Sequence, residues 1–193
     1  MRFLLLIALA MAAAPTALAQ PTSAYYGLQY GEFDYTEDDG AGTDLIADTV
    51  SSYRLMVGYQ FTENMAFEGG WGQTDDVVTS FDVDFGFPVG LVPSTLTYEF
   101  EILTVRFLGV LPFDNGITLL GGLGYADMDW EGTIVYGDFG SQSADLSEGD
   151  LTYYAGVQYD WERFAIRLGY EKYDLSNDFS DIDETAISFF YKL

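Results

Sequence analysis

Aspartate and glutamate supply most of the chemistry that this sequence could perform. The chain of 193 residues has 31 acidic side chains, seven basic ones, no histidine and no cysteine. These counts exclude imidazole bases, thiolate nucleophiles, disulfides and the commonest zinc ligands. The formal net charge of -24 also argues against a nucleic-acid partner, since phosphate binding needs basic patches. Acid–base chemistry by paired carboxylates and the binding of divalent cations remain.

Most of these carboxylates fall in stretches that the sequence predicts as connections between strands. A glycosidase-like acid/base pair needs a cleft that shields one carboxyl group from water. Acids in connections favour a solvated acidic rim that discourages aggregation. Asp127, Asp129 and Glu131 share one face at strand spacing and offer oxygen ligands that calcium or magnesium could use. We therefore predict no cofactor other than a loop-bound Ca²⁺ or Mg²⁺, which would also bridge acidic loops to phosphate-bearing lipids.

The first residues have the features of a secretory signal. Arg2 supplies the positive start, residues 3–14 form an apolar stretch, and Ala17, Leu18 and Ala19 form a small-residue cleavage pattern. An apolar stretch of this length is too short to span a bilayer, which takes roughly twenty residues. We therefore expect a signal peptide over residues 1–19 and one exported domain over residues 20–193.

Apolar residues recur at every second position through that domain, which indicates strands rather than helices. Short and long connections alternate between the expected strands, an asymmetry typical of a transmembrane barrel. The sequence therefore predicts an all-β fold: an eight-stranded antiparallel transmembrane β-barrel with short periplasmic turns and long acidic extracellular loops. The expected strands lie near residues 24–35, 50–60, 65–77, 96–111, 117–129, 150–159, 164–174 and 184–193.

The polarity of the two strand faces decides between a membrane barrel and a soluble lipocalin-like barrel, which shows the same period with the apolar face inside. Here the less apolar face is rich in glycine, alanine, serine and threonine, which suits the narrow interior of an eight-stranded barrel. The other face is rich in tyrosine, phenylalanine, leucine and valine, which suits lipid. An arginine facing lipid at mid-membrane would cost about 2–4 kcal/mol. We therefore predict an inward charge network of Arg54, Glu68, Arg106, Arg167 and Glu171.

One stretch breaks this alternation. Tyr98, Phe100 and Ile102 share one phase, whereas Leu103, Val105 and further apolar residues occupy the other. A one-residue bulge near residues 101–103 would flip the face, so we predict a bulge there and two hairpins raised above the membrane. These hairpins could bury their rings against each other or bind another surface by edge pairing or apolar contact. Their candidate interaction residues are Phe81, Val83, Phe85, Phe87, Trp130 and Tyr136.

Residues 57–71, with a Gly-Tyr strand end, a Thr-x-Asn turn and an Ala-x-Glu strand, resemble a hairpin of small outer-membrane barrels of the OmpA and OmpX type. Residues 106–112 and 119–125 look like the next hairpin of that family. The resemblance covers essentially the whole exported domain and implies the outer membrane of a Gram-negative bacterium. It departs at Leu193, where such barrels usually end in an aromatic residue that the assembly machinery reads. No peptidoglycan-binding domain is expected after the barrel.

The resemblance implies a structural anchor, an adhesin or a narrow channel. Enzymatic barrels of this membrane generally rely on a catalytic histidine, which this sequence lacks, so we expect no enzyme. Our first hypothesis is an outer-membrane barrel with a polar, plugged lumen that acts as envelope scaffold or surface-interaction protein. The alternatives are a narrow porin-like channel for ions or small solutes and a soluble periplasmic ligand-binding barrel. Expected partners are outer-membrane lipid, lipopolysaccharide and the assembly machinery; the extracellular partner is unknown.

Overall fold

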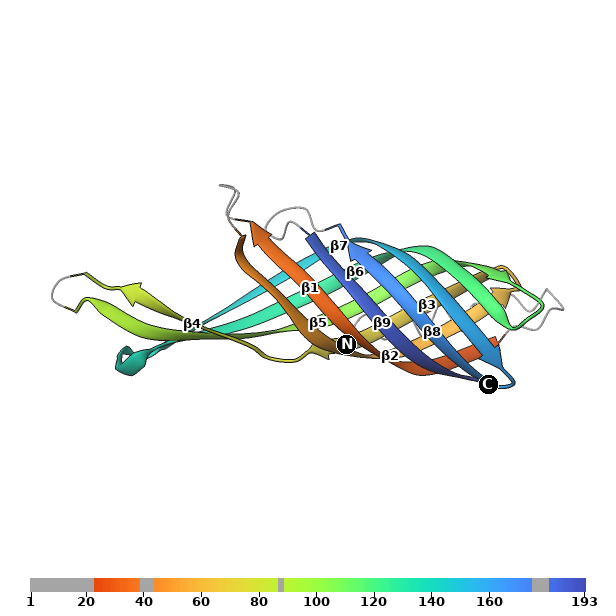
Figure 1. Cartoon of the computed structure of the whole chain (residues 1–193), viewed down its shortest axis with the longest axis horizontal. Helices are drawn as coiled ribbons and strands as arrows, with labels where there is room; N and C mark the ends of the chain where they lie inside the picture. The colour runs from red at the N-terminus through yellow and green to blue at the C-terminus, as the bar shows by residue number, and fades with distance from the viewer. Residues whose placement is uncertain (1–22, 39–43, 87–88, 175–180) are drawn as a thin grey trace.

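The strands of this chain are long and antiparallel. The computed structural model describes residues 23–38, 44–86, 89–174 and 181–193 (Figure 1). Within that part of the chain, the one helix is a 3₁₀ turn, η1 (Gly137–Phe139), and it is too short to cross a membrane. The strands are β1 (Ser23–Asp38), β2 (Asp44–Thr62), β3 (Met65–Thr74), β4 (Val77–Asp84), β5 (Leu91–Pro112), β6 (Ile117–Tyr136), β7 (Ser141–Trp161), β8 (Phe164–Tyr173) and β9 (Asp181–Lys192).

Hydrogen bonding closes these strands into a ring. Neighbours follow the order β3-β2-β1-β9-β8-β7-β6-β5, and β3 also pairs with β5, from Met65 opposite Gly109 to Gln73 opposite Glu101. β4 then continues along the same side of β5 from Val77, opposite Tyr98. β3 and β4 therefore occupy one position, and the described strands form a ring of eight positions. The predicted eight-stranded antiparallel barrel is confirmed.

The two faces of the ring have the polarity of a membrane barrel. Apolar side chains point out of the ring, and Leu28, Leu55, Leu123 and Leu168 are each more than half exposed. Inward-facing residues are buried and include Ser52, Thr104, Gly70 and Gly72. The soluble periplasmic barrel needs the opposite polarity, so that alternative is wrong. Tyrosines such as Tyr30 and Tyr53, whose ring centres lie 5.3 Å apart, sit on the outer face as expected of an interfacial aromatic girdle.

The bulge expected near residues 101–103 is absent, and that prediction is wrong. The β5–β6 register runs without a shift from Ser94 opposite Tyr136 to Pro112 opposite Thr118. Tyr98, Phe100 and Ile102 point inward in the same phase as Thr104. The change in pattern therefore reflects a change of interior environment along the barrel, from small and polar residues to apolar ones.

The two raised hairpins are present, and together they form a single sheet. β4 and residues 91–99, 131–136 and 141–145 of β5, β6 and β7 pair side by side above the ring. We call this four-stranded extension the wing. Figure 1 shows it reaching far beyond the upper ends of β1, β2, β8 and β9, on the side opposite the short turns. Since outer-membrane barrels place their short turns in the periplasm, the wing stands on the extracellular side.

Close approach of neighbouring strands requires glycine at Gly72, and this requirement gives a test of the packing. A Cβ at this position would lie 1.9 Å from the Tyr53 carbonyl oxygen and 2.5 Å from Arg54 Cγ. Gly72→Ala should therefore lower the free energy of unfolding by about 1–3 kcal/mol, as overpacking does. Urea unfolding of the micellar protein, followed by tryptophan fluorescence, measures the change. Gly109→Ala is the control, because its nearest neighbour lies 3.5 Å away. Equal losses for the two variants would contradict the packing.

Candidate functional site

A network of ion pairs fills the middle of the lumen. Arg106 Nε lies 3.0 Å from Glu68 Oε2, and Arg106 Nη1 lies 3.2 Å from Glu171 Oε2. Arg54 Nη1 reaches the same Glu171 oxygen at 3.2 Å, and Arg167 Nη1 reaches Glu68 Oε1 at 2.6 Å. None of these five side chains is more than 3% exposed. The structure thus brings together all five residues that the sequence placed inside the barrel.

A sixth charged residue, Glu184 of β9, completes this network. Its Oε2 lies 2.6 Å from Arg54 Nη2 and accepts a hydrogen bond of 3.1 Å from Gln29 Nε2, while the Ser52 hydroxyl donates to its other oxygen. The sequence analysis missed Glu184, although it shares the inward phase of Ala186 and Ser188. With three arginines and three glutamates, the lumen charge network is formally neutral. Its members are Arg54, Glu68, Arg106, Arg167, Glu171 and Glu184.

Aromatic side chains enclose the arginines. The guanidinium carbon of Arg106 lies 4.2 Å from the centre of the Tyr154 ring, and that of Arg167 lies 4.3 Å from the centre of the Phe190 ring. Such cation–π contacts are strongest where water is excluded. Tyr25 adds a hydrogen bond of 2.6 Å from its hydroxyl to Glu68 Oε1. The network is therefore held by ring faces and hydroxyl groups as well as by opposite charges.

An apolar cluster closes the lumen above the charges. Its most buried members include Phe33, Phe100, Ile102, Tyr173 and Ile182, each at most 2% exposed. The sequence analysis missed this cluster because it expected small side chains along the whole interior. At the periplasmic end, a hollow of about 20 Å³ is lined by residues from all eight positions of the ring, Arg167 among them.

The three acids predicted to bind a cation lie on the outer face of β6. Asp127, Asp129 and Glu131 follow one another outward from the aromatic girdle at Tyr125. Burial raises the pKa of Asp127 above its ordinary value, and the neighbouring Asp129 carboxylate raises it further. In the described part of the chain, no three or more carboxylates are grouped closely enough to hold a metal ion. Calcium or magnesium binding at these residues stays a prediction.

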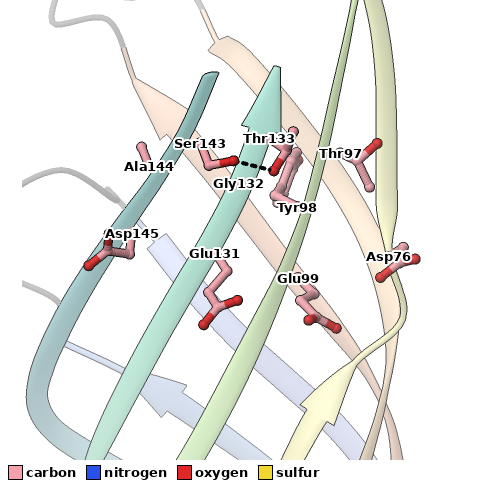
Figure 2. Close-up of a pocket in the computed structure, with 10 residues that line it drawn as sticks. All are labelled: Asp76, Thr97, Tyr98, Glu99, Glu131, Gly132, Thr133, Ser143, Ala144 and Asp145. Carbon is pink, nitrogen blue, oxygen red and sulfur yellow. Dashed lines mark hydrogen bonds between the residues drawn. The ribbon is translucent and has the colours of Figure 1, made fainter. Parts of the chain in front are cut away.

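Glu131 belongs to a different arrangement, which the sequence did not reveal. Glu99 pairs with Glu131 across β5 and β6, and Glu131 pairs with Asp145 across β6 and β7. Figure 2 shows these three residues in line with Asp76, which lies between β3 and β4. We call Asp76, Glu99, Glu131 and Asp145 the acidic row. It lines a hollow of about 470 Å³ on the outer face of the wing.

Hydroxyl groups form the next row of the wing above these acids. Thr97 pairs with Thr133, and Thr133 pairs with Ser143. The Thr133 and Ser143 hydroxyl oxygens lie 2.9 Å apart, within hydrogen-bond distance (Figure 2). These two rows make the middle of the outer face polar, while Val78, Leu91 and Val135 are exposed beside and above them on the same face.

The aromatic residues predicted for surface interaction divide between two places. Phe85 contacts Tyr136 edge-on at 5.6 Å and stacks on Phe139 at 5.9 Å, forming a tip in which Phe139 is 65% exposed. Trp130 lies deeper, with its ring 6.1 Å from that of Tyr98, against the apolar cluster. Phe81 and Val83 lie on the inner face of the wing and are partly exposed. Phe87 lies outside the described residues.

Comparison with known proteins extends these findings. The family model of the outer membrane protein beta-barrel domain matches residues 3–192. No curated protein sequence matches this chain. Many solved structures are similar to it in fold, and two serve as examples. One is Ail, the attachment invasion locus protein of Yersinia pestis, in complex with a heparin analogue. The sequences are 21% identical, the match covers 89% of this chain and 97% of that chain, and the TM-score is 0.57. The other is Neisserial surface protein A. The sequences are 12% identical, the match covers 90% of this chain and 100% of that chain, and the TM-score is 0.59.

The lumen charge network makes a direct prediction about stability. Arg106→Met removes a guanidinium that pairs with both Glu68 and Glu171 and leaves buried carboxylates without their partner. Breaking a buried pair in this way costs about 3–5 kcal/mol, and urea unfolding of the micellar protein should show a loss of that size. Arg163→Met is the matched control, because the Arg163 side chain is exposed in a turn and donates a hydrogen bond to the Tyr191 hydroxyl. A loss for Arg106→Met no larger than for Arg163→Met would refute the role of the network.

Proposed function

This chain belongs to the outer membrane protein beta-barrel domain family, and we propose that it is a non-conducting, non-enzymatic barrel that acts as envelope scaffold or surface-interaction protein. It is an outer-membrane protein of a Gram-negative bacterium, and its barrel is surrounded by lipid and lipopolysaccharide. The observation that carries the proposal is the closure of the lumen. A solute would have to pass the apolar cluster and then separate buried ion pairs, each step at a high cost in free energy.

The proposal of a non-enzymatic role is supported by the state of the lumen acids. An acid/base pair of carboxylates needs a substrate cleft and one carboxyl group in its neutral form. Glu68 and Glu171 are instead each bonded to two arginines, which stabilises their charged form. The absence of histidine and cysteine from the sequence also removes imidazole bases and thiolate nucleophiles.

A surface-interaction role is supported by the wing, which extends polar strands above the membrane. Both similar structures carry names that speak of attachment or of the cell surface. The heparin analogue bound to Ail is sucrose octasulfate, a polyanion. The acidic row and the net charge of -24 would repel a polyanion.

We also propose that the outer-membrane assembly machinery inserts this barrel through its last strand. β9 carries outward-facing Phe189 and ends next to β1, where the Leu193 amide donates to the Ala24 carbonyl at 2.9 Å. Tyr191 packs on Phe164 at 5.4 Å in the same region. The aromatic character of the strand is thus present even though the final residue is leucine.

Single-channel recording tests the closed lumen. The purified protein, shown to be folded by its heat-dependent gel mobility, is inserted into a planar bilayer, with a trimeric porin as the positive control. We expect no discrete conductance steps, because ion pairs and apolar rings fill the lumen. Regular steps from inserted barrels would overturn the proposal and favour the narrow channel. If steps appear, calcium is added on the extracellular side, and block of the current would implicate the acidic loops.

Protease treatment of whole cells tests the surface exposure of the wing. Chymotrypsin cleaves after aromatic residues, and the wing tip offers Phe139 at 65% exposure. We expect cleavage there in intact cells, because the wing faces outward. Phe113, in the short turn between β5 and β6, is 48% exposed and should be cut only after the outer membrane is permeabilised. Fragment masses distinguish the two sites, and the opposite order of cleavage would show that the barrel is inverted.

A further inference from the structure

A carboxylate oxygen is buried without a partner at the extracellular mouth of the barrel. It is Oε1 of Glu148 on β7, which is shielded from solvent and makes no hydrogen bond within the described part of the chain. The residue as a whole is partly exposed. A buried acceptor without a partner destabilises the folded state, and a charged acceptor does so more strongly than a neutral one. A group that donates a hydrogen bond to this oxygen would therefore be bound favourably.

The strand register places Glu148 on the inner face, just above the apolar cluster. Glu148 is opposite Met128 of β6, which is 4% exposed and belongs to that cluster. Because alternate residues of a strand share a face, Glu148 points inward like Thr152, which is 1% exposed. β8 ends at Tyr173, opposite Thr152, so Glu148 lies beyond the last paired residues of β8. The carboxylate therefore stands at the opening of the lumen.

The chain has no cation of its own to pair with Glu148. The exported domain has six basic residues, and three of them are the arginines of the lumen charge network. Lys192 pairs with Asp160 at 2.6 Å near the periplasmic turns, and Arg163 lies in one of those turns. Lys172 is exposed on the outer face of β8. A cationic partner for Glu148 must therefore come from outside the protein.

Apolar side chains beside Glu148 select the kind of cation. Leu146 shares the inner face with Glu148 and is opposite Trp130 of β6. Leu146 is 42% exposed, and Trp130 is partly buried, with its ring centre 6.1 Å from that of Tyr98. A single carboxylate offers too few ligands for calcium or magnesium, which take six or more oxygens. An ammonium group with an apolar body matches both the carboxylate and the apolar surface.

We propose that Glu148, Leu146 and Trp130 bind a small organic cation, a primary ammonium with an apolar body. The ammonium group donates a hydrogen bond to Glu148 Oε1, and the apolar body lies along Leu146 and Trp130. Charge-assisted hydrogen bonding and the burial of apolar surface both favour the complex. The site lies above the closed part of the lumen, so the ligand is held at the mouth and is not conducted. This binding goes beyond the scaffold or surface-interaction role proposed above.

Calorimetric titration of the full-length protein in nanodiscs tests the site, with empty nanodiscs as the background. The probe is hexylammonium. Two matched probes each lack one of its parts: hexanol keeps the apolar body, and methylammonium keeps the charge. We expect saturable binding of hexylammonium and affinities at least about tenfold lower for the two matched probes, because each has lost one kind of contact. No binding of hexylammonium, or equal binding of either matched probe, would overturn the proposal.

Two charge variants locate the ammonium group. Glu148→Gln removes the charge and keeps the shape of the side chain, so hexylammonium should bind about tenfold more weakly. Glu99→Gln is the matched control for general electrostatic attraction, because Glu99 lies on the outer face of the wing (Figure 2). It should leave the affinity unchanged. Equal losses for the two variants would show that the cation is attracted by the overall charge and would refute the site.

Two apolar variants locate the body of the ligand. Leu146→Ala removes apolar surface beside the carboxylate, so hexylammonium should bind about fivefold more weakly. Leu91→Ala is the matched control, because Leu91 is 67% exposed on the outer face of the wing. It should leave the affinity unchanged. An affinity unaffected by Leu146→Ala would contradict the placement of the apolar body.

Urea unfolding of the micellar protein tests the unpaired carboxylate and the competing occupant. Since a ligand of the folded state stabilises it, hexylammonium should raise the urea midpoint of the wild type and leave that of Glu148→Gln unchanged. Without ligand, Glu148→Gln should unfold at a higher midpoint than the wild type, because it removes a buried unpaired charge. A lower midpoint would show that the carboxylate already has a partner and would refute the proposal.

Calcium alone is the last arm of this experiment. A rise in the wild-type midpoint equal to that with hexylammonium, and lost in Glu148→Gln, would show that an inorganic cation occupies the site and would overturn the proposal. Heat-dependent gel mobility confirms that each variant is folded. Silent bilayer recordings of the same variants confirm a closed barrel, so failure of ligand binding is distinguished from failure of the closed-lumen proposal.

Discussion

The neutralisation of charge inside a narrow, water-poor lumen is the constraint on which the rest of this structure depends. Three guanidinium groups and three carboxylates are at most 3% exposed, and none could remain charged there without an opposite charge at hydrogen-bond distance. These partners come from strands far apart in the sequence: Glu68 on β3 and Arg167 on β8, for example. The ion pairs therefore fix which strands face each other across the ring, as well as filling its centre.

This charge network dictates the small residues that surround it. Six long charged side chains occupy much of the interior of an eight-position ring, so the neighbouring inward positions must be small. Gly72 shows the limit, since even a Cβ there would collide with the Tyr53 carbonyl and the Arg54 side chain. Above the charges, the inward positions need a different kind of side chain. Without more polar partners, the interior is filled by rings such as Phe33 and Phe100, and the inward face becomes apolar without any change of register.

The period of two and the polarity of the faces were sufficient to predict the barrel, its orientation and five residues of the network, because these features depend on local alternation. The features that were missed depend on register between strands. The apolar phase of Tyr98, Phe100 and Ile102 was interpreted as a bulge, since alternation alone cannot distinguish a flipped face from an interior that turns apolar. Glu184 stood in the inward phase, but its pairing with Arg54 requires β9 to lie within reach of β2 across β1. The acidic row likewise arises only when β5, β6 and β7 are aligned.

Carboxylate side chains have opposite surroundings in the lumen and on the wing. In the lumen charge network, Glu68, Glu171 and Glu184 each have an arginine partner, and the network is neutral. On the outer face of the wing, Glu99, Glu131 and Asp145 lie in register with one another. The basic residues of the exported domain number only six, and three of them are in the lumen. The extracellular surface consequently has little internal compensation for its acids. Its field therefore attracts cationic groups and repels anionic ones.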